Sequence, residues 1–327
     1  AGCTAVVKPG EDAPASARAL AEVLGRVFPP DYITVAEGGR EEAEALVDKP
    51  FDVIFFTGSP AVGKKVMAAA AEHLTPVTLE LGGRSPVILA PDADVELAAA
   101  RIAWGKFLNA GQTCVAPDYL FVQESVKQKF IEYLKYWIDK MFGTEPLKNS
   151  DYPRIINEKH YERLMKLIEG ESIVKGGYGN KERLFIAPTV LDNITEHSPI
   201  MQEEIFGPIL PVLSYGNLEE AEAFIKKGEK PLALYLFTGN KKTEQRILNT
   251  ISFGGGCIND TIIHLATSRM GFGGVGASGM GSYHGKRSFD TFSHTRSIVK
   301  KYQWIDLPIR YQPYTRRKKK LLHLFLK

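Results

Sequence analysis

One stretch decides the fold class, Phe51-Asp52-Val53-Ile54-Phe55-Phe56-Thr57-Gly58-Ser59-Pro60-Ala61-Val62-Gly63. Its first half is almost continuously apolar, which predicts a strand over Phe51–Thr57 that is covered on both faces, as strands of parallel sheets are. Its second half predicts a turn and then a helix over Val62–Glu72. A strand that leads straight into a helix is the repeating unit of doubly wound α/β folds.

The same alternation extends to both sides of this stretch. Apolar runs predict strands, and helical spacing predicts helices between them. The strands are Thr4–Lys8, Tyr32–Ala36, Val77–Leu81 and Pro86–Ala90, and the helices are Ala15–Val27 and Arg40–Val47. We expect the run Thr4–Lys8 to form a buried strand. Because single helices separate the strands, right-handed crossovers and a parallel sheet are expected.

A second alternation of helices and strands follows residue 84. It comprises helices at Val95–Asn109, Lys127–Met141, Leu218–Lys227 and Lys242–Ile251, and strands at Ala187–Leu191, Ile209–Ser214 and Ala233–Phe237. The 327 residues exceed one ordinary hydrophobic core. We therefore predict two α/β domains, over residues 1–83 and 84–290, and a C-terminal segment over 291–327.

The composition excludes several classes of protein. A formal net charge of +3 does not indicate a nucleic-acid partner, and no apolar run is long enough to cross a bilayer. The three cysteines, Cys3, Cys114 and Cys257, are widely spaced and odd in number, which argues against a disulfide framework and a zinc site. A reducing compartment fits best, so the predicted location is cytoplasmic.

Cys114 lies in a loop of small residues, Ala110–Pro117, directly after a predicted helix. Small neighbours would give a substrate access to a nucleophilic thiolate, and exposed backbone amides could stabilise an oxyanion. A free cysteine is also often a buried structural residue, so its local context leaves both interpretations open. A cysteine protease that uses His264, His284 or His294 is a weaker hypothesis, because protease signatures around Cys114 are absent.

Two acidic positions are candidates for chemistry. Glu80 ends an apolar strand and is followed by Gly82 and Gly83, so it is either a general base with a pKa raised by burial or an ordinary strand-end carboxylate. The pair Glu203 and Glu204 could in principle form a metal or glycosidase dyad, but no second acidic cluster supports one.

The turn after Phe51–Thr57 is a candidate dinucleotide site. Gly58, Ser59 and Gly63 could bring a helix N-terminus towards a pyrophosphate, although the spacing is not G-x-G-x-x-G. Lys8 and Glu11 follow the first strand, at the edge where open α/β sheets bind ligands. They could bind ribose hydroxyls or be ordinary solvated charges.

The order of these motifs resembles that of the aldehyde dehydrogenase superfamily over essentially the whole chain. The motifs are Val7–Glu11, Phe56–Ser59, Glu80–Gly83, Gly111–Cys114, Glu204–Pro208 and the glycine-rich Gly271–Gly281. Three later ones, Gly279–Gly285, Phe289–His294 and Arg310–Tyr314, are similar to the class-three branch. The resemblance implies the aldehyde dehydrogenase fold, in which a doubly wound cofactor domain, incomplete here at its N-terminus, joins an α/β catalytic domain.

The resemblance also implies a mechanism. Cys114 would add to the aldehyde as a thiolate and form a thiohemiacetal, hydride would pass to NAD(P)⁺, and Glu80 would activate water to hydrolyse the thioester. Lys8 and Glu11 would bind the adenosine ribose. The remaining cofactor contacts would come from Gly58, Ser59, Gly63 and Leu81 near the pyrophosphate, and from Glu204 and Phe206 at the nicotinamide riboside. Glu11 favours NAD electrostatically, and NADP stays open.

Three departures from the family pattern stand out. The family's oxyanion-hole asparagine lies upstream of Lys8, in a segment that this sequence does not contain, so we expect the chain alone to be poorly active or unstable. Arg84 replaces the usual Lys after the two glycines, and Met270-Gly271 replaces the usual Leu-Pro.

Several alternatives remain. A CoA-acylating reductase of the same superfamily commonly lacks the water-activating Glu, so Glu80 argues against it. A non-catalytic fragment or pseudoenzyme is the second alternative. The family also implies a homodimer. Basic residues beside leucines in the tail Arg316–Lys327 suggest peripheral membrane attachment, and the aldehyde itself is not defined.

Overall fold

The computed structural model describes residues 1–325. The strands are β1 Ala5–Val7, β2 Ile33–Val35, β3 Ile54–Thr57, β4 Val77–Glu80, β5 Pro86–Leu89, β6 Tyr119–Gln123, β7 Ser172–Lys175, β8 Gly179–Asn180, β9 Phe185–Ile186, β10 Thr189–Asp192, β11 Ile209–Tyr215, β12 Ala233–Phe237, β13 Gly255–Ile258 and β14 Gly279–Met280. The α-helices are α1 Pro14–Val27, α2 Arg40–Val47, α3 Pro60–Ala71, α4 Val95–Phe107, α5 Glu124–Phe142, α6 Glu158–Leu167, α7 Leu218–Lys227, α8 Lys241–Thr250, α9 Lys286–Thr291 and α10 Arg316–Phe325. The chain divides into two compact units, Ala1–Phe292 and Ser293–Lys327.

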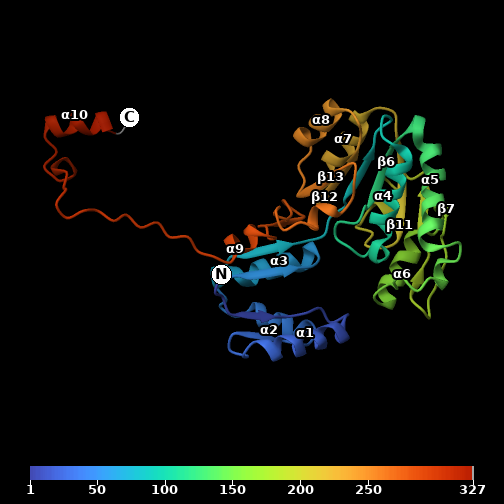
Figure 1. Cartoon of the computed structure of the whole chain (residues 1–327), viewed down its shortest axis with the longest axis horizontal. Coiled ribbons are helices and arrows are strands. Elements are labelled where there is room, and N and C mark those ends of the chain that lie inside the picture. Colours follow the sequence, from blue (N-terminus) through green and yellow to red (C-terminus); the bar gives the residue numbers. More distant parts are fainter. Residues whose placement is uncertain (326–327) are drawn as a thin grey trace. The chain divides into compact units, whose positions relative to one another are not determined.

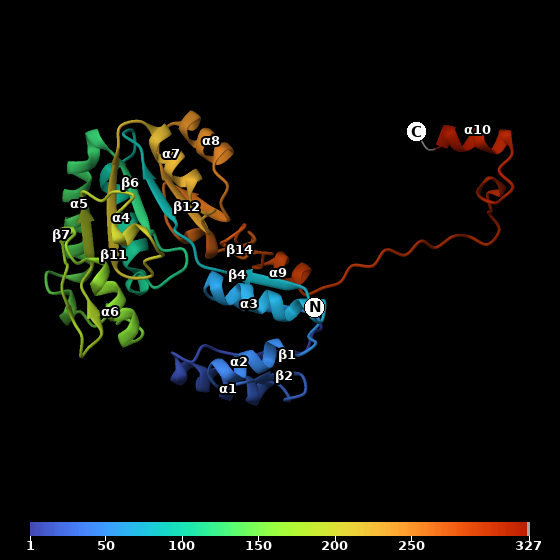
Figure 2. The same ribbon diagram turned by 180° about the vertical axis from the view of Figure 1, so that it is seen from behind.

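The largest sheet of the first unit has seven strands and lies among helices α4 to α8 (Figures 1 and 2). Its order is β13-β12-β5-β6-β11-β10-β7, and the pairs between β13 and β10 are all parallel. Only the edge strand β7 runs antiparallel to its neighbour. Strands separated by single helices favour such parallel pairs, but of the strands predicted between Thr4 and Ala90 only the last, β5, joins this sheet, so the prediction of one parallel sheet for them is wrong.

Helices cover both faces of this sheet, and β6 shows why. Leu120 and Val122 belong to the hydrophobic core shared with α4 and α5, whereas Tyr119 and Phe121 belong to the core shared with α6, α7 and α8. Successive side chains of a strand point to opposite faces, so a continuously apolar strand requires cover on both. Each fully buried large apolar side chain contributes roughly 1.5–3 kcal/mol.

Two of the three smaller sheets contain the strands that precede β5, and the third is the pair β8-β9. Strands β1 and β2 pair in parallel. Strands β3 and β4 also pair in parallel, and β14 from the glycine-rich segment joins β4 antiparallel. Gly279 permits this pairing, because it has a φ of +144° and an added Cβ would lie 2.2 Å from the Leu79 carbonyl oxygen. The glycine-rich segment therefore lies directly beside the strand that carries Glu80.

Several predicted elements differ from the structure. The strand predicted over Phe51–Thr57 begins only at Ile54, because the Phe51 N–H bonds to Lys49 in a turn. It is also only half-buried, with Phe55 37% exposed, so the prediction of cover on both faces is wrong. Strand β1 is likewise largely exposed, not buried. Helix α4 ends at Phe107, because Asn109 and Ala110 have left-handed backbone angles.

Some elements were not predicted at all. They include β6, β7, β13 and α6. Strand β6 follows the Cys114 loop so closely that the loop prediction obscured it, and β13 contains glycines, which weaken a strand pattern. The predicted division into residues 1–83, 84–290 and 291–327 remains a prediction.

The second unit carries little regular structure before α10. Most of its apolar side chains are exposed, among them Val299 and Trp304. Within residues 1–325, no helix is both long and apolar enough to cross a membrane.

Candidate active site

Glu80 lies at the carboxyl end of β4, between two backbone partners. It is opposite Thr57 of β3 in the parallel pair and opposite Gly279 of β14 in the antiparallel pair. The Gly58 N–H donates to the Glu80 carbonyl at 3.0 Å, which closes the end of the β3–β4 ladder. Carboxyl ends of parallel strands are where α/β folds bind ligands.

The Glu80 side chain is buried but unsatisfied. It is 2% exposed, and neither carboxylate oxygen has a hydrogen-bond partner among the described residues. Burial raises the pKa of this carboxyl to about 7. An unpaired buried carboxylate is destabilising, so this one is suited to accept a proton near neutral pH. Of the two sequence interpretations, the solvent-facing strand-end carboxylate is wrong.

Cys114 lies in a loop that glycine allows to fold tightly. Asn109, Ala110 and Gly111 all have positive φ, and an added Cβ at Gly111 would lie 2.2 Å from the Gly207 carbonyl oxygen. This close approach brings the cysteine loop against the loop that contains Glu204. Gln112 ties the loop down further, since its side chain donates to the Arg154 carbonyl at 2.9 Å and accepts from the Ile156 N–H at 2.9 Å.

The Cys114 thiol is partly buried beside two carboxylates. Burial raises its pKa to about 11, and the negative charges of Glu204 and Glu80 act in the same direction. Hydrogen bonding from the backbone N–H groups of Cys114 and Val115 lowers the pKa of the thiol and so opposes this shift. The fold therefore gathers Glu80, Cys114 and Glu204 from three distant parts of the sequence. A thiol with this pKa is protonated at neutral pH and needs a base to react.

The backbone around Glu204 is held by two charged side chains. Asp118 accepts the Ile205 N–H at 2.9 Å, and Arg163 of α6 donates to the Ile205 carbonyl at 2.7 Å. Phe206 is 38% exposed and has a φ of +46°, an unfavourable angle for a bulky residue. Strain of this kind persists only where surrounding contacts enforce it, and it presents the Phe206 ring to solvent next to Glu204.

Glu204 packs against the glycine pair that follows Glu80. Its carboxylate accepts the Gly83 N–H, and burial raises its pKa to about 7. Glu203 instead faces outward and pairs with Arg163 at 2.9 Å. The two neighbouring carboxylates thus have different partners, which argues against a metal or glycosidase dyad.

Substituting Gly82→Ala should displace Glu204. An added Cβ would lie 2.0 Å from Glu204 Oε2, so the carboxylate must move by an ångström or more. A shift of about 1 Å in a reacting site costs about 10²-fold in rate, and we expect a loss of this order in kcat/KM. Gly25→Ala on α1 is the control, since no atom lies within 4 Å of its added Cβ. Equal activity of the two variants would contradict the placement of Glu204.

A buried charged cluster beneath these loops was missed by the sequence analysis. Lys106 is 1% exposed, burial lowers its pKa to about 8, and Asp118 and Glu204 oppose that shift. Asp118 is 3% exposed and pairs with Arg84 at 3.3 Å. The sequence did contain a signal for the burial of Lys106, because this residue falls on the same helix face as the apolar Ile102 and Ala103. Arg84, which replaces the Lys usual in the family, also donates to the Met201 carbonyl. Its guanidinium thus binds Asp118 and Met201 at once, which suits the several donors of Arg.

Four of the predicted cofactor residues gather at the ends of β3 and β4. Ser59 caps α3, its hydroxyl accepting the Val62 N–H at 3.4 Å. An added Cβ at Gly63 would lie 2.5 Å from the Leu81 side chain, so Gly63 lets α3 approach β4 closely. Gly58 forms the turn between them. In the first turn of α3, Pro60 has no N–H and the Val62 and Gly63 N–H groups bond to Ser59, so the Ala61 N–H is the donor that this turn can offer to an anion. These residues fit a pyrophosphate.

Lys8 and Glu11 lie elsewhere, after β1. The Lys8 amino group donates to the Pro9 carbonyl at 2.8 Å. Hydrogen bonds from the backbone N–H groups of Glu42 and Gly39 lower the pKa of the Glu42 carboxyl, and the charge of Lys8 adds a smaller effect in the same direction. Glu11 lies near Gly39, at the start of α2. These two side chains flank the end of the β1–β2 pair and not the β3–β4 turn, as expected if they contact a different part of a dinucleotide.

The histidines do not form a pair with Cys114 among the described contacts. His264 has Nδ1 3.5 Å from the Cys257 sulfur, and burial lowers its pKa to about 4. His284 stacks on Phe272, with ring centroids 5.5 Å apart. The cysteine-protease hypothesis gains no support from this arrangement.

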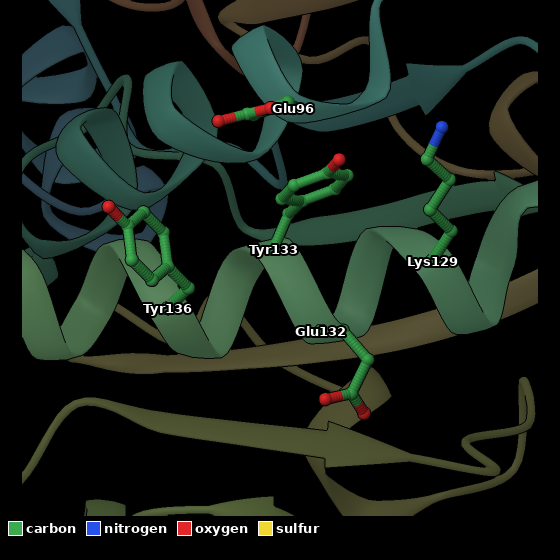
Figure 3. A pocket seen from close by; sticks show the side chains of 5 residues that line it. All are labelled: Glu96, Lys129, Glu132, Tyr133 and Tyr136. Atoms are coloured by element: carbon green, nitrogen blue, oxygen red, sulfur yellow. The ribbon is translucent and has the colours of Figure 1, made fainter.

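A groove of about 450 Å³ lies between α4 and α5, away from these residues. Tyr133 and Tyr136 rise from α5 towards α4, which carries Glu96 (Figure 3). Glu96 is in the first turn of α4, whereas the Cys114 loop follows its last turn, about 15 Å along the helix axis. The groove is therefore separate from the candidate active site.

Comparison with known proteins gives a consistent result. The model of the "Aldehyde dehydrogenase family" matches residues 1–298. The 4,4'-diaponeurosporen-aldehyde dehydrogenase of Staphylococcus aureus is 51% identical, over 96% of this chain and 69% of the relative. The "Aldehyde dehydrogenase, dimeric NADP-preferring" of Canis lupus familiaris is 47% identical, over 91% and 66%. The chain thus spans about two thirds of the length of these relatives.

Solved structures agree with the fold. The substrate-bound state of Staphylococcus aureus AldH superposes with a TM-score of 0.96 at 50% identity, over 99% of this chain and 71% of that one. A Mycobacterium tuberculosis aldehyde dehydrogenase complexed with NAD⁺ gives a TM-score of 0.83 at 31% identity, over 94% and 65%. The fold expected from the sequence motifs is confirmed.

Proposed function

The chain belongs to the aldehyde dehydrogenase family, and on that premise we propose that it carries the reaction centre that oxidises an aldehyde to a carboxylic acid with NAD(P)⁺. The observation that supports this most is the convergence of a partly buried thiol, Cys114, with a buried carboxylate, Glu80, and a half-buried one, Glu204. One nucleophile and a proton acceptor of pKa near 7 are what a covalent oxidation followed by hydrolysis requires.

In the first step the Cys114 sulfur attacks the aldehyde carbon, and its proton must leave as the carbon–sulfur bond forms. The nearby carboxylates, with pKa values of about 7, are the proton acceptors. A difference of about four pKa units from the thiol corresponds to an unfavourable transfer of about 5 kcal/mol. Bond formation to carbon must offset this cost, so the thiol reacts only when an aldehyde is in place.

The oxyanion that develops on the aldehyde oxygen needs hydrogen-bond donors. The backbone N–H groups of Cys114 and Val115 lower the pKa of the thiol, so they lie near the sulfur and are the candidate donors. A dinucleotide held here would supply the acceptor for the hydride of the adduct. Gly58, Ser59, Gly63 and Leu81 would hold its pyrophosphate, Lys8 and Glu11 its adenosine ribose, and Glu204 and Phe206 its nicotinamide end.

Hydrolysis of the thioester then depends on Glu80. Its carboxylate has no partner of its own, so a water can occupy that position and give up a proton as it attacks the acyl carbon. The carbon–sulfur bond breaks, the acid leaves and Cys114 regains its proton. A free Glu80 carboxylate also favours hydrolysis over the CoA-acylating alternative. Water activated beside the thioester would hydrolyse it before the thiol of CoA could take the acyl group.

Two further properties belong to the proposal. We propose a homodimer, since a relative 47% identical is named as dimeric, and a reducing compartment such as the cytoplasm. Glu11 disfavours the 2′-phosphate of NADP, whereas that same relative is named as NADP-preferring, so we expect NAD to be used first and NADP also to be accepted.

The test is reduced-nicotinamide formation with a panel of aliphatic and aromatic aldehydes. It uses this chain and a chain extended N-terminally to the length of its relatives. We expect activity in the extended chain, with a rate that rises with pH through about 7, because only ionised Glu80 can activate water. A single group of this pKa makes the rate at pH 6 about tenfold lower than the plateau. A folded, extended chain without aldehyde-dependent activity would favour the pseudoenzyme alternative.

A further inference from the structure

The C-terminal unit has a strong net positive charge, whereas the rest of the chain has a net negative one. Its sequence from Ser293 contains ten Lys and Arg residues and one Asp, a formal charge of +9. The remaining residues contain 31 Lys and Arg against 37 Asp and Glu, a formal charge of −6. A small positive total of +3 therefore conceals a strong asymmetry, and such asymmetry indicates an interaction with an anionic partner.

Helix α10 concentrates this charge next to apolar residues. Arg316–Lys320 are five consecutive cations, and Leu321, Leu322 and Leu324 follow in the same helix (Figure 1). At about 100° per residue, the three leucines fall within an arc of about 160°, and Arg316, Lys319 and Lys320 lie on the other side. Leu321 is 48% exposed and Leu324 is 74% exposed. The helix thus has one charged face and one exposed apolar face.

The cations of α10 have no acidic side chain within their own unit to neutralise them. Asp306 is the only acidic residue in that part of the sequence, and it pairs with Lys301 at 2.8 Å and approaches Arg310 at 3.9 Å. Lys318 donates to the backbone carbonyl of Tyr311 at 2.9 Å, which leaves its charge uncompensated. The charge of Arg316–Lys320 is therefore available to an external partner.

We propose that α10 is an interfacial anchor that lies in the headgroup region of an anionic lipid bilayer. Lipid phosphates would attract the charged face, the leucines would enter the boundary of the acyl chains, and Arg317 and Lys318 would extend their long side chains to the surface. Peripheral binding normally needs two signals, and α10 supplies both a polybasic run and an apolar face. A nucleic acid would use the cations but leave the leucine face exposed to water.

The charged surface of a second copy could also attract these cations, so the test separates the two partners. The full chain is sedimented with vesicles of phosphatidylcholine alone and with vesicles that contain about one third phosphatidylglycerol. We expect at least tenfold tighter partitioning to the anionic vesicles, and most of this gain should be lost at about 0.5 M salt, because charge attraction is screened.

Three variants identify the surface responsible. The triple variant Lys318→Glu/Lys319→Glu/Lys320→Glu should lose at least tenfold in partitioning, and Leu321→Ser/Leu324→Ser should lose a comparable factor at low salt. The matched control Lys230→Glu/Lys241→Glu/Lys242→Glu makes the same charge change at exposed positions of the other unit and should partition like the unchanged chain.

Two outcomes would overturn the proposal. Equal partitioning to neutral and anionic vesicles, or an equal loss in the control, would show that α10 does not bind a lipid surface by charge. Absence of vesicle binding, together with a change of oligomeric state in the Lys318–Lys320 variant by analytical ultracentrifugation, would assign the helix to a contact between copies of the chain.

Discussion

Replacing Cys114 by Ser should lower aldehyde-dependent formation of reduced nicotinamide by at least about 10³-fold in the extended chain. The oxygen of serine is less nucleophilic and far harder to ionise than the thiol, and the proposed mechanism has no second nucleophile. The loss should appear in kcat, because no thioester can form. Rates with each aldehyde at saturating cofactor measure it.

Cys257→Ser is the matched control for that experiment. Cys257 is also a half-buried free cysteine, but it contacts His264 and lies on β13. We expect its activity to remain within a few-fold of the unchanged protein. If Cys114→Ser remained active while Cys257→Ser lost activity, the assignment of the nucleophile would be wrong.

Replacing Glu80 by Gln should separate oxidation from hydrolysis. Glu204 remains as a proton acceptor for the thiol, so the first turnover should still release about one equivalent of reduced nicotinamide per site. Hydrolysis loses its general base, and steady-state turnover should fall by about 10²–10⁴-fold. Rapid mixing would show the burst, and mass spectrometry of the stalled protein would show an acyl group on Cys114.

The control for this variant is Glu203→Gln, which alters a carboxylate that faces solvent and pairs with Arg163. Its turnover should change by no more than about threefold. Unchanged turnover in Glu80→Gln would remove Glu80 from the mechanism. Loss of the burst along with turnover would instead assign Glu80 to the attack step.

Ionisation of Glu80 and Glu204 also changes the stability of the folded chain with pH. Glu80 and Glu204 have pKa values raised to about 7 from an ordinary value of 4.5. Their protonated forms are therefore favoured in the folded chain, and stability contributed below pH 4.5 is lost as the pH rises towards 7. The two carboxyl groups thus contribute least to the stability of the folded chain in the pH range where they are ionised and reactive.

Local patterns in the sequence were sufficient for many elements. Helices α2 and α7 and strand β12 have the bounds that periodicity predicts, because their apolar spacing and flanking polar residues agree. The ordered motifs also identified the family, which the comparisons confirm. Glu80, Cys114 and Glu204 were each named, yet the residues alone could not decide between chemistry and structure for any of them.

The sequence by itself determined the α/β alternation, the family and the candidate residues, since these depend on residues close together in the chain. Only the tertiary structure decided that Glu80 is buried without a partner, that Cys114 lies beside two carboxylates, and that Lys106 and Asp118 form a charged cluster beneath them. The reason is that these properties arise where backbones distant in sequence approach closely, as at Gly111 against Gly207 and at Gly82 against Glu204. Periodicity predicts which elements form, but burial and pKa depend on what those elements pack against.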